Sequence, residues 1–238
     1  MVFFDSINQL ARDTPWAHGV VLGYATYGVG LFGALLLLGW WLSRGQGPAA
    51  TAAALWAGAA TLLALALNQP IVHLVDEPRP FTDHPGILVL AHRSADGSFP
   101  SDHAVMAGAA AAGLWLVSRL VAARSLPAQP LPAQPLPAQP LPAQPLPARS
   151  LPAQALALRR LAVVATVAAL AMAFSRVYIA AHYPQDVLAG LVFGAAVSLL
   201  GWQLLQRPLT WLVGAAGKTV LRPLVDRAPG ASSASRLG

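Results

Sequence analysis

The stretch "SRVYIAAHYPQD", Ser175 to Asp186, places an arginine, a histidine and an aspartate at the junction of two apolar runs. A guanidinium donates hydrogen bonds to two phosphate oxygens at once, so Arg176 suits a phosphate group. Asp186 can fix the tautomer of the His182 ring and leave its other nitrogen free as a nucleophile. Taken singly, Arg176 could snorkel to the membrane surface and Asp186 could cap a helix, but this does not explain why both flank a histidine.

A second polar motif, "SFPSDHA" from Ser98 to Ala104, precedes another apolar run. Ser101 is a favoured helix N-cap, and the free N–H groups of the first helical turn, including that of Asp102, form a site suited to an anion. His103 stands in this turn, where it can give or take a proton near neutral pH. The alternative is that Ser101 and Asp102 only cap the helix.

Arg79 lies in a third motif, "EPRPF", and completes a set of groups suited to in-line phosphoryl transfer. Two arginines and a helix start would hold the phosphate while one histidine attacks phosphorus and the other protonates the leaving oxygen. The chain has no cysteine and no acidic cluster dedicated to a metal, so we expect no metal site and no cofactor. The nearby carboxylates leave assistance by Mg²⁺ open.

The elements that must position these groups are membrane helices. The chain of 238 residues is 56% hydrophobic and only 10% charged, unlike an average soluble protein. Its net charge of +6 comes from basic residues at the ends of apolar runs, so no nucleic-acid partner is expected. Runs of about 20 apolar residues, the length that crosses a bilayer, predict an all-α polytopic bundle with five transmembrane helices at roughly Trp16–Leu42, Thr51–Val72, Ala104–Ala123, Leu156–Phe174 and Val187–Gln206.

The amino terminus has the pattern of a short amphipathic helix. Phe3, Phe4, Ile7, Leu10 and Ala11 fall on one helical face. We expect a helix that lies in the bilayer interface, with a helix that caps the bundle as an equal alternative. No cleaved signal is expected, because the basic amino-terminal region of a secretory signal is missing.

A low-complexity segment separates the third and fourth spans. The pentad LPAQP repeats from Leu126 to Pro145, and its prolines forbid helix and sheet and favour extended polyproline II. We interpret residues 125–155 as a solvated insertion without a catalytic role, with a ligand for a proline-recognition domain as the alternative. Residues 1–207 then form one membrane domain, and residues 208–238 form an interfacial or cytoplasmic tail that is partly disordered.

The charges of the loops indicate how the chain is oriented. With five spans, the amino terminus and the loops that carry the three motifs share one side, which has four basic and eight acidic residues. The other side has eleven basic residues and Asp226 as its one acidic residue. Lysine and arginine prefer the cytoplasmic side, so we expect the motifs to face outward and the pentad loop and the carboxyl terminus to face the cytoplasm.

The three motifs resemble the signatures of the type-2 phosphatidic-acid phosphatase family: Arg79 with Pro80, "PSDH" at Pro100 to His103, and "SR" followed by His182 and Asp186. The resemblance covers residues 68–190 apart from the pentad insertion. It implies an α-helical membrane bundle whose site lies at the outer membrane surface. The roles it implies are a nucleophile that forms a phosphohistidine (His182), its orienting carboxylate (Asp186), an acid for the leaving group (His103), and phosphate-binding groups (Arg79, Ser101, Asp102 through its N–H, and Arg176).

The chain departs from the family pattern at two positions. Val72 stands where the family usually has a lysine, seven residues before the arginine, and Asp102 stands where it usually has a glycine. Together with "INQLA", "YGVGLF" and "DEPRPF", these departures resemble the bacitracin-resistance type of undecaprenyl-diphosphate phosphatase. That branch implies a protein of the bacterial cytoplasmic membrane that recycles a lipid carrier for cell-wall glycans such as peptidoglycan.

Other functions stay open at this stage. A broader phosphatase acting on phosphatidic acid or phosphatidylglycerophosphate, or a lipid phosphotransferase, would use the same residues. A non-catalytic transporter or scaffold would use them as a structural network, although the spans lack the interrupted, repeated helices typical of transporters. The expected partners are a lipid phosphate and the bilayer, and the sequence indicates no protein partner.

Overall fold

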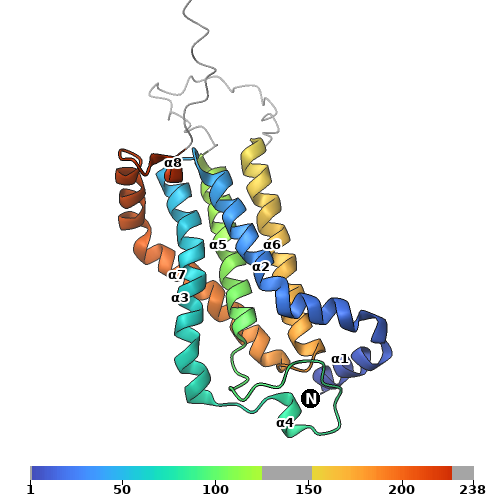
Figure 1. Cartoon of the computed structure of the whole chain (residues 1–238). Helices are drawn as coiled ribbons and strands as arrows, with labels where there is room; N and C mark the ends of the chain where they lie inside the picture. Colours follow the sequence, from blue (N-terminus) through green and yellow to red (C-terminus); the bar gives the residue numbers. More distant parts are fainter. Residues whose placement is uncertain (1, 125–151, 227–238) are drawn as a thin grey trace, which may run out of the picture.

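The computed structural model describes residues 2–124 and 152–226 of the chain, and within these ranges it is all-α, as predicted. Residues 125–151, with most of the predicted insertion, and residues 227–238 of the predicted tail lie outside the described ranges. Figure 1 shows the long helices side by side. The elements are α1 (Val2–Asp13), the 3₁₀ turn η1 (Pro15–Ala17), α2 (His18–Ser43), α3 (Pro48–Val75), α4 (Pro80–Asp83), α5 (Asp102–Arg124), α6 (Ala153–Tyr178), α7 (Pro184–Ala216) and α8 (Arg222–Val225).

Five helical segments are long and apolar enough to cross a membrane, which confirms the predicted number of spans. Each contains the span predicted from its apolar run and extends beyond it at both ends. The polar residues at the junctions therefore lie in helical turns rather than in loops: Asp102 begins α5, Arg176 lies in the last turn of α6, and Asp186 lies in the first turn of α7.

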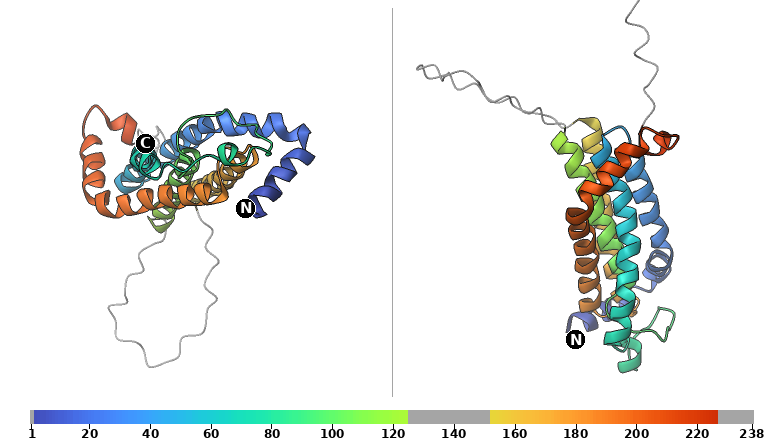
Figure 2. Two further views of the ribbon diagram at one scale, coloured as in Figure 1. Left: turned by 90° about the horizontal axis from the view of Figure 1, so that it is seen from below. Right: turned by 90° about the vertical axis from the view of Figure 1, so that its left-hand side faces the viewer.

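The predicted domain end at residue 207 falls inside α7, which continues through Pro208 to Ala216. Figures 1 and 2 show α7 crossing the bundle obliquely and bending before its red carboxyl-terminal part, as a helix with an internal proline does. After α7, the short α8 is fastened to the end of α2, since Trp40 Nε1 donates to the Leu224 carbonyl at 3.0 Å and Arg44 to the Pro223 carbonyl at 2.7 Å. The first part of the predicted tail is thus packed on the bundle.

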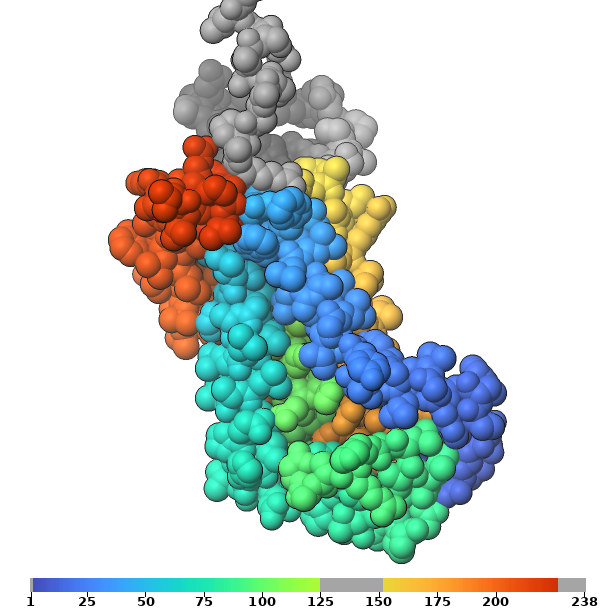
Figure 3. Space-filling model, viewed as in Figure 1, coloured from blue at the N-terminus to red at the C-terminus, as the bar shows by residue number. Residues whose placement is uncertain are grey.

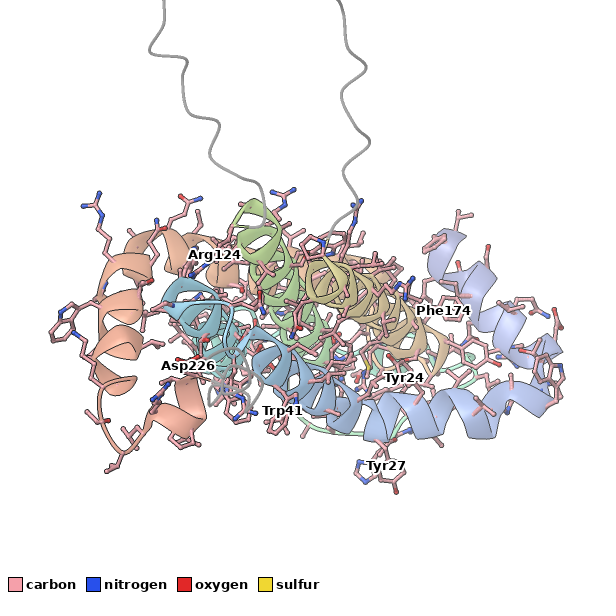
Figure 4. All side chains as sticks on the ribbon, turned by 90° about the horizontal axis from the view of Figure 1, so that it is seen from above. Tyr24, Tyr27, Trp41, Arg124, Phe174 and Asp226 are labelled. Atoms are coloured by element: carbon pink, nitrogen blue, oxygen red, sulfur yellow. The ribbon has the colours of Figure 1, made fainter. Side chains whose placement is uncertain are left out.

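The two faces of α2 have different surroundings. Tyr24 turns toward α6, where its hydroxyl donates to the Ala168 carbonyl at 2.7 Å, whereas Tyr27 points away from the bundle and is 80% exposed (Figure 4). A polytopic protein presents such apolar and aromatic side chains to lipid. The outward face of α2 therefore fits contact with the bilayer.

The amino-terminal helix packs on the bundle. Phe4, Ile7 and Ala11 are buried against the end of α6, while Phe3 and Leu10 on the predicted apolar face remain exposed. α1 also holds the loop that follows α4, because the Asn8 side chain exchanges two hydrogen bonds with the backbone of Leu88, at 2.7 and 3.0 Å. The buried face of α1 agrees with the interpretation of this helix as a cap on the bundle. Figure 3 shows α1 and the loop side by side at one end of the molecule.

The central helix α5 lies in direct backbone contact with α7. A Cβ atom on Gly194 of α7 would lie 2.0 Å from the carbonyl oxygen of Val105, and one on Gly108 of α5 would lie 2.2 Å from that of Leu191. Small residues permit this close approach between membrane helices. Since the contact lies just after the amino-terminal turns of both helices, it brings the "PSDH" motif next to Asp186.

We expect Gly194→Ala to lower the free energy of unfolding by about 1–3 kcal/mol or more, because the added methyl group meets backbone atoms that cannot rotate away. Gly33→Ala is the matched control, since a Cβ there meets no atom within 4 Å. Thermal unfolding of both variants in the same detergent checks this. Equal melting temperatures for the two variants would contradict the close α5–α7 contact.

Candidate active site

The loop of residues 84–101 is held across the end of α6. The backbone N–H groups of Leu90 and Ala91 both donate to the Ile179 carbonyl, at 3.2 and 3.0 Å. Further along, the N–H of Ser98 donates to the Glu77 carbonyl at 2.7 Å. These bonds bring the "SFPSDHA" motif onto the turn that carries His182.

The turn after α6 reverses the chain sharply. Ala180 has the left-handed backbone conformation (φ 59°), its N–H donates to the Val177 carbonyl, and the Ala181 N–H donates to that of Arg176, both at 3.0 Å. This pair of bonds is the Schellman arrangement that ends many helices. It returns the chain over the helix end, so His182 lies close to Arg176 before Pro184 starts α7.

His182 is 3% exposed, and its two ring nitrogens have partners of opposite kind. Nδ1 lies 2.8 Å from the Ser98 carbonyl oxygen, which can only accept, so Nδ1 carries the proton. Nε2 lies 3.3 Å from Nη1 of Arg79, which can only donate, so Nε2 is unprotonated and its lone pair accepts that hydrogen bond. Burial lowers the pKa of His182 and the charges of Arg176 and Arg79 lower it further, while the contact with Asp186 opposes the shift. The ring is therefore neutral at neutral pH, as a nucleophile requires.

Asp186 reaches His182 mainly through Ser98. Its Oδ2 atom accepts hydrogen bonds from the Ser98 hydroxyl, at 2.5 Å, and from the Tyr183 N–H, at 2.8 Å, but lies 3.6 Å from His182 Nδ1. The sequence suggested a direct hydrogen bond between aspartate and histidine, whereas Ser98 stands between them here. Sequence reasoning gave Ser98 no role, and its place at the start of the "SFPSDHA" motif was the one signal for it.

A cavity of about 200 Å³ opens beside His182 and is large enough for a phosphate group. Five of the seven predicted site residues line it, and the other two, Ser101 and Asp186, are fully buried and joined by a 3.2 Å bond from the Ser101 N–H to the Asp186 carbonyl. The lining consists of Val72, Arg79, Ser94, Asp96, Gly97, Pro100, Asp102, His103, Arg176 and His182. The predicted residues thus gather at one place, although they come from α3–α4, α5, α6 and the turn before α7.

The start of α5 differs in part from the predicted anion site. Because the Ser101 N–H is bonded to the Asp186 carbonyl, it is not free for a phosphate. The buried Ser101 hydroxyl has no partner among the described residues and remains able to donate. Asp102 and His103 in the first turn line the cavity, whereas Ser101 lies behind its wall.

The carboxylate of Asp102 is held by amide groups of α3. Its Oδ1 atom accepts from Asn68 Nδ2 at 2.7 Å and from Gln69 Nε2 at 3.0 Å, and Asn68 also donates to the Pro100 carbonyl. Asn68 is fully buried. Sequence reasoning missed this pair, whose signal was two adjacent polar side chains near the end of an apolar span. The amides disperse part of the negative charge that Asp102 adds beside the cavity.

No cation lies on α3 where the family usually has a lysine. Val72 lines the cavity with an apolar side chain, and the neighbouring His73 is exposed and is not part of the lining. Within residues 2–124 and 152–226, no three histidine or acidic side chains come together as ligands for a metal ion. Arg79 and Arg176 are the two arginines in the lining of the cavity.

The family model of the PAP2 superfamily matches residues 53–209, which begin within α3, end within α7 and include every residue of the cavity. The chain belongs to the PAP2 superfamily. It is also 24% identical to undecaprenyl-diphosphatase BcrC of Bacillus subtilis (strain 168) over 226 residues, covering 94% of each chain. No solved structure matches it significantly. These comparisons support a phosphatase, and with the five spans they describe a multi-pass membrane protein.

The pH dependence of this PAP2 protein should reflect the depressed pKa of His182. Only the neutral ring attacks phosphorus, so kcat/KM should fall as the pH drops through that pKa, which lies below the ordinary histidine value of about 6.5. The measurement is kcat/KM against pH, corrected for titration of the substrate itself. An acid limb centred above pH 6.5 would show that burial does not control the ionisation of the nucleophile.

Proposed function

We propose that the chain hydrolyses undecaprenyl diphosphate to undecaprenyl phosphate through a phosphohistidine formed on His182. The observation that carries the proposal is a buried, neutral histidine whose unprotonated Nε2 faces Arg79 beside a phosphate-sized cavity. The choice of substrate is supported by the similarity to undecaprenyl-diphosphatase BcrC along nearly the whole chain. The PAP2 family assignment supports the phosphatase reaction itself.

In the first step, the lone pair of His182 Nε2 forms a bond to the terminal phosphorus as the bond to the bridging oxygen breaks. Arg79 and Arg176 hold the non-bridging oxygens, where negative charge is concentrated in the transition state. His103 donates a proton to the leaving lipid phosphate. The Ser98 carbonyl keeps the Nδ1 proton in place, and Asp186 stabilises the positive charge that the phosphorylated ring gains.

In the second step, water attacks the phosphohistidine. His103, now unprotonated, takes one proton from that water as its oxygen bonds to phosphorus. The bond between phosphorus and Nε2 breaks, and its electron pair returns to the ring. Orthophosphate leaves, and both histidines regain the states in which they began.

The proposed location is the bacterial cytoplasmic membrane, with the cavity on the extracytoplasmic face. Figure 1 shows the amino terminus, α4 and the start of α5 at one end of the bundle, and the residues that line the cavity include Arg79 just before α4 and Asp102 at the start of α5. This side is the one poor in basic residues. A diphosphate head group at the membrane surface would reach this end while its polyprenyl tail stays among the lipids.

A broader lipid-phosphate phosphatase or a lipid phosphotransferase remains the second candidate, because the site binds only the phosphate and acyl or prenyl chains would contact apolar surfaces. Phosphatidic acid and phosphatidylglycerophosphate are its test substrates. A transporter or scaffold would leave all of these lipids unhydrolysed.

The test measures phosphate release by the detergent-purified protein from undecaprenyl diphosphate and from phosphatidic acid, with EDTA present. We expect faster release from the diphosphate, and His182→Ala should lose at least about 10⁴-fold in kcat because no nucleophile remains. Asp186→Asn should slow turnover severely while its melting curve shows a folded protein. Preference for phosphatidic acid would favour the second candidate, and release unchanged in His182→Ala would exclude the phosphohistidine.

His103 has a more selective role than His182, because its proton matters only when the leaving group needs one. We expect His103→Ala to lose about 10²–10⁴-fold with a lipid diphosphate. With p-nitrophenyl phosphate, whose leaving group departs without a proton near neutral pH, formation of the phosphohistidine should be slowed far less. Burst and steady-state measurements on both substrates separate the two steps, and equal losses in the first step would contradict the assignment of His103 as the acid.

A further inference from the structure

Arg79 has partners on all three of its guanidinium nitrogens. Nε donates to the backbone carbonyl of Asp96 at 3.0 Å, and Nη2 donates to the Asp96 carboxylate at 3.1 Å. Nη1 donates to the Ala181 carbonyl at 2.9 Å and lies 3.3 Å from Nε2 of His182. The arginine is thus held by a carboxylate on one side and covers the nucleophilic nitrogen on the other.

Arg176, the second cation of the cavity, has far fewer bonds. Its Nη1 lies 3.4 Å from the Ala25 carbonyl, and its buried Nε has no partner among the described residues. Arg176 therefore has donors ready for a phosphate, whereas four of the five N–H groups of Arg79 already have acceptors. A phosphate that takes two hydrogen bonds from Arg79 has to displace one of these acceptors, and the Asp96 carboxylate is the one with a half-exposed side chain.

We propose that Asp96 is a positioning residue that competes with the substrate phosphate for Arg79: it holds the arginine over His182 in the empty site and returns to it as orthophosphate leaves. The inference rests on the proposed function only in requiring that a phosphate group binds in this cavity. A carboxylate and a phosphate oxygen offer a guanidinium the same kind of charge-assisted hydrogen bond. Phosphate adds charge and a second arginine, so it can displace the carboxylate.

The exposure of the two side chains shows which partner moves. The side chain of Arg79 is 9% exposed, but that of Asp96 is 53% exposed, so the carboxylate can turn into water at little cost. The carboxylate is charged at neutral pH: partial burial raises its pKa, but a hydrogen bond from Ser94 and the charge of Arg79 outweigh this and lower it. The backbone carbonyl of Asp96 still holds Nε of Arg79 when the carboxylate has left.

The same exchange frees the nucleophile. Nε2 of His182 cannot attack phosphorus while its lone pair accepts a hydrogen bond from Nη1 of Arg79. A phosphate bound to the guanidinium draws its N–H groups toward the phosphate oxygens and away from the ring. The nucleophile is thus uncovered only when a phosphate is present.

The test uses Asp96→Asn, which keeps the size of the side chain and removes its charge, and Asp96→Ala, which removes both. The matched control is Asp5→Asn, which makes the same charge change at an exposed residue of α1, outside the cavity. Each protein is assayed for KM and kcat with undecaprenyl diphosphate and for inhibition by orthophosphate and by vanadate. Vanadate binding by calorimetry adds a readout that needs no turnover, and melting curves show whether each variant is folded.

We expect both Asp96 variants to have lower KM and lower inhibition constants for orthophosphate and vanadate, by roughly two- to tenfold, as for loss of one partly exposed ion-pair competitor. Their kcat should not rise, because product phosphate leaves more slowly, and Asp5→Asn should match the natural chain. Weaker vanadate binding in the variants would mean that Asp96 supports the phosphate-binding pose of Arg79, and unchanged binding would mean that it does not compete; either result overturns the proposal. A natural chain that binds vanadate without hydrolysing any lipid would refute the proposed reaction while the binding comparison still tests Asp96.

Discussion

The hydrogen bond from His182 Nδ1 to the Ser98 carbonyl is the interaction on which the site depends. It assigns the ring proton to one nitrogen and leaves the other unprotonated beside the cavity, so in the proposed reaction a single backbone carbonyl determines which atom attacks. That carbonyl belongs to a loop, and a loop holds a position only if its own backbone bonds are satisfied elsewhere. The bonds of this loop to Ile179, to Glu77 and, through Leu88, to Asn8 of α1 supply that support. The amino-terminal helix thus supports the proposed site from a distance, because it holds the path of the loop.

The two aspartates near His182 differ in how deeply they are buried, and therefore in how freely they can change partners. Asp186 is fully buried, and its Oδ2 accepts from the Ser98 hydroxyl and the Tyr183 N–H, two donors that are themselves buried. Asp96 is half exposed and can exchange its partner for water. The two aspartates therefore differ in kind: one is a fixed part of the framework around the nucleophile, and the other can respond to an incoming anion.

The sequence predicted the fold well because five apolar runs of bilayer length leave few alternatives to a helical bundle. The predicted spans stopped short of the real helix ends, since residues such as Asp102 and Arg176 are too polar for a hydropathy count yet find partners or a cavity in the folded chain. The gathering of Arg79, His103, Arg176 and His182 followed from motifs at one end of the bundle. The parts played by Ser98, Asn68 and Asp96 could not be predicted, because they depend on the path of a loop without regular structure. The fifth span was predicted to end at Gln206, whereas α7 bends and continues through Pro208 to Ala216.

The two departures from the family pattern act in the same direction on the charge of the cavity. Valine in place of lysine removes one positive charge at position 72, and aspartate in place of glycine adds one negative charge at position 102, so the cavity is less positive by two charges than the family pattern would make it. Such a site binds free orthophosphate less tightly. Weaker binding of the product does not slow the chemical step, because the rate of that step depends on how tightly the transition state is bound relative to the bound substrate. The amides of Asn68 and Gln69 hold the Asp102 carboxylate toward α3. There it makes the electrostatic potential of the cavity less positive without occupying the space proposed for the phosphate. In the proposed reaction orthophosphate must leave in every cycle, so a cavity with two arginines and two tethered or exchangeable carboxylates favours turnover over retention of that product.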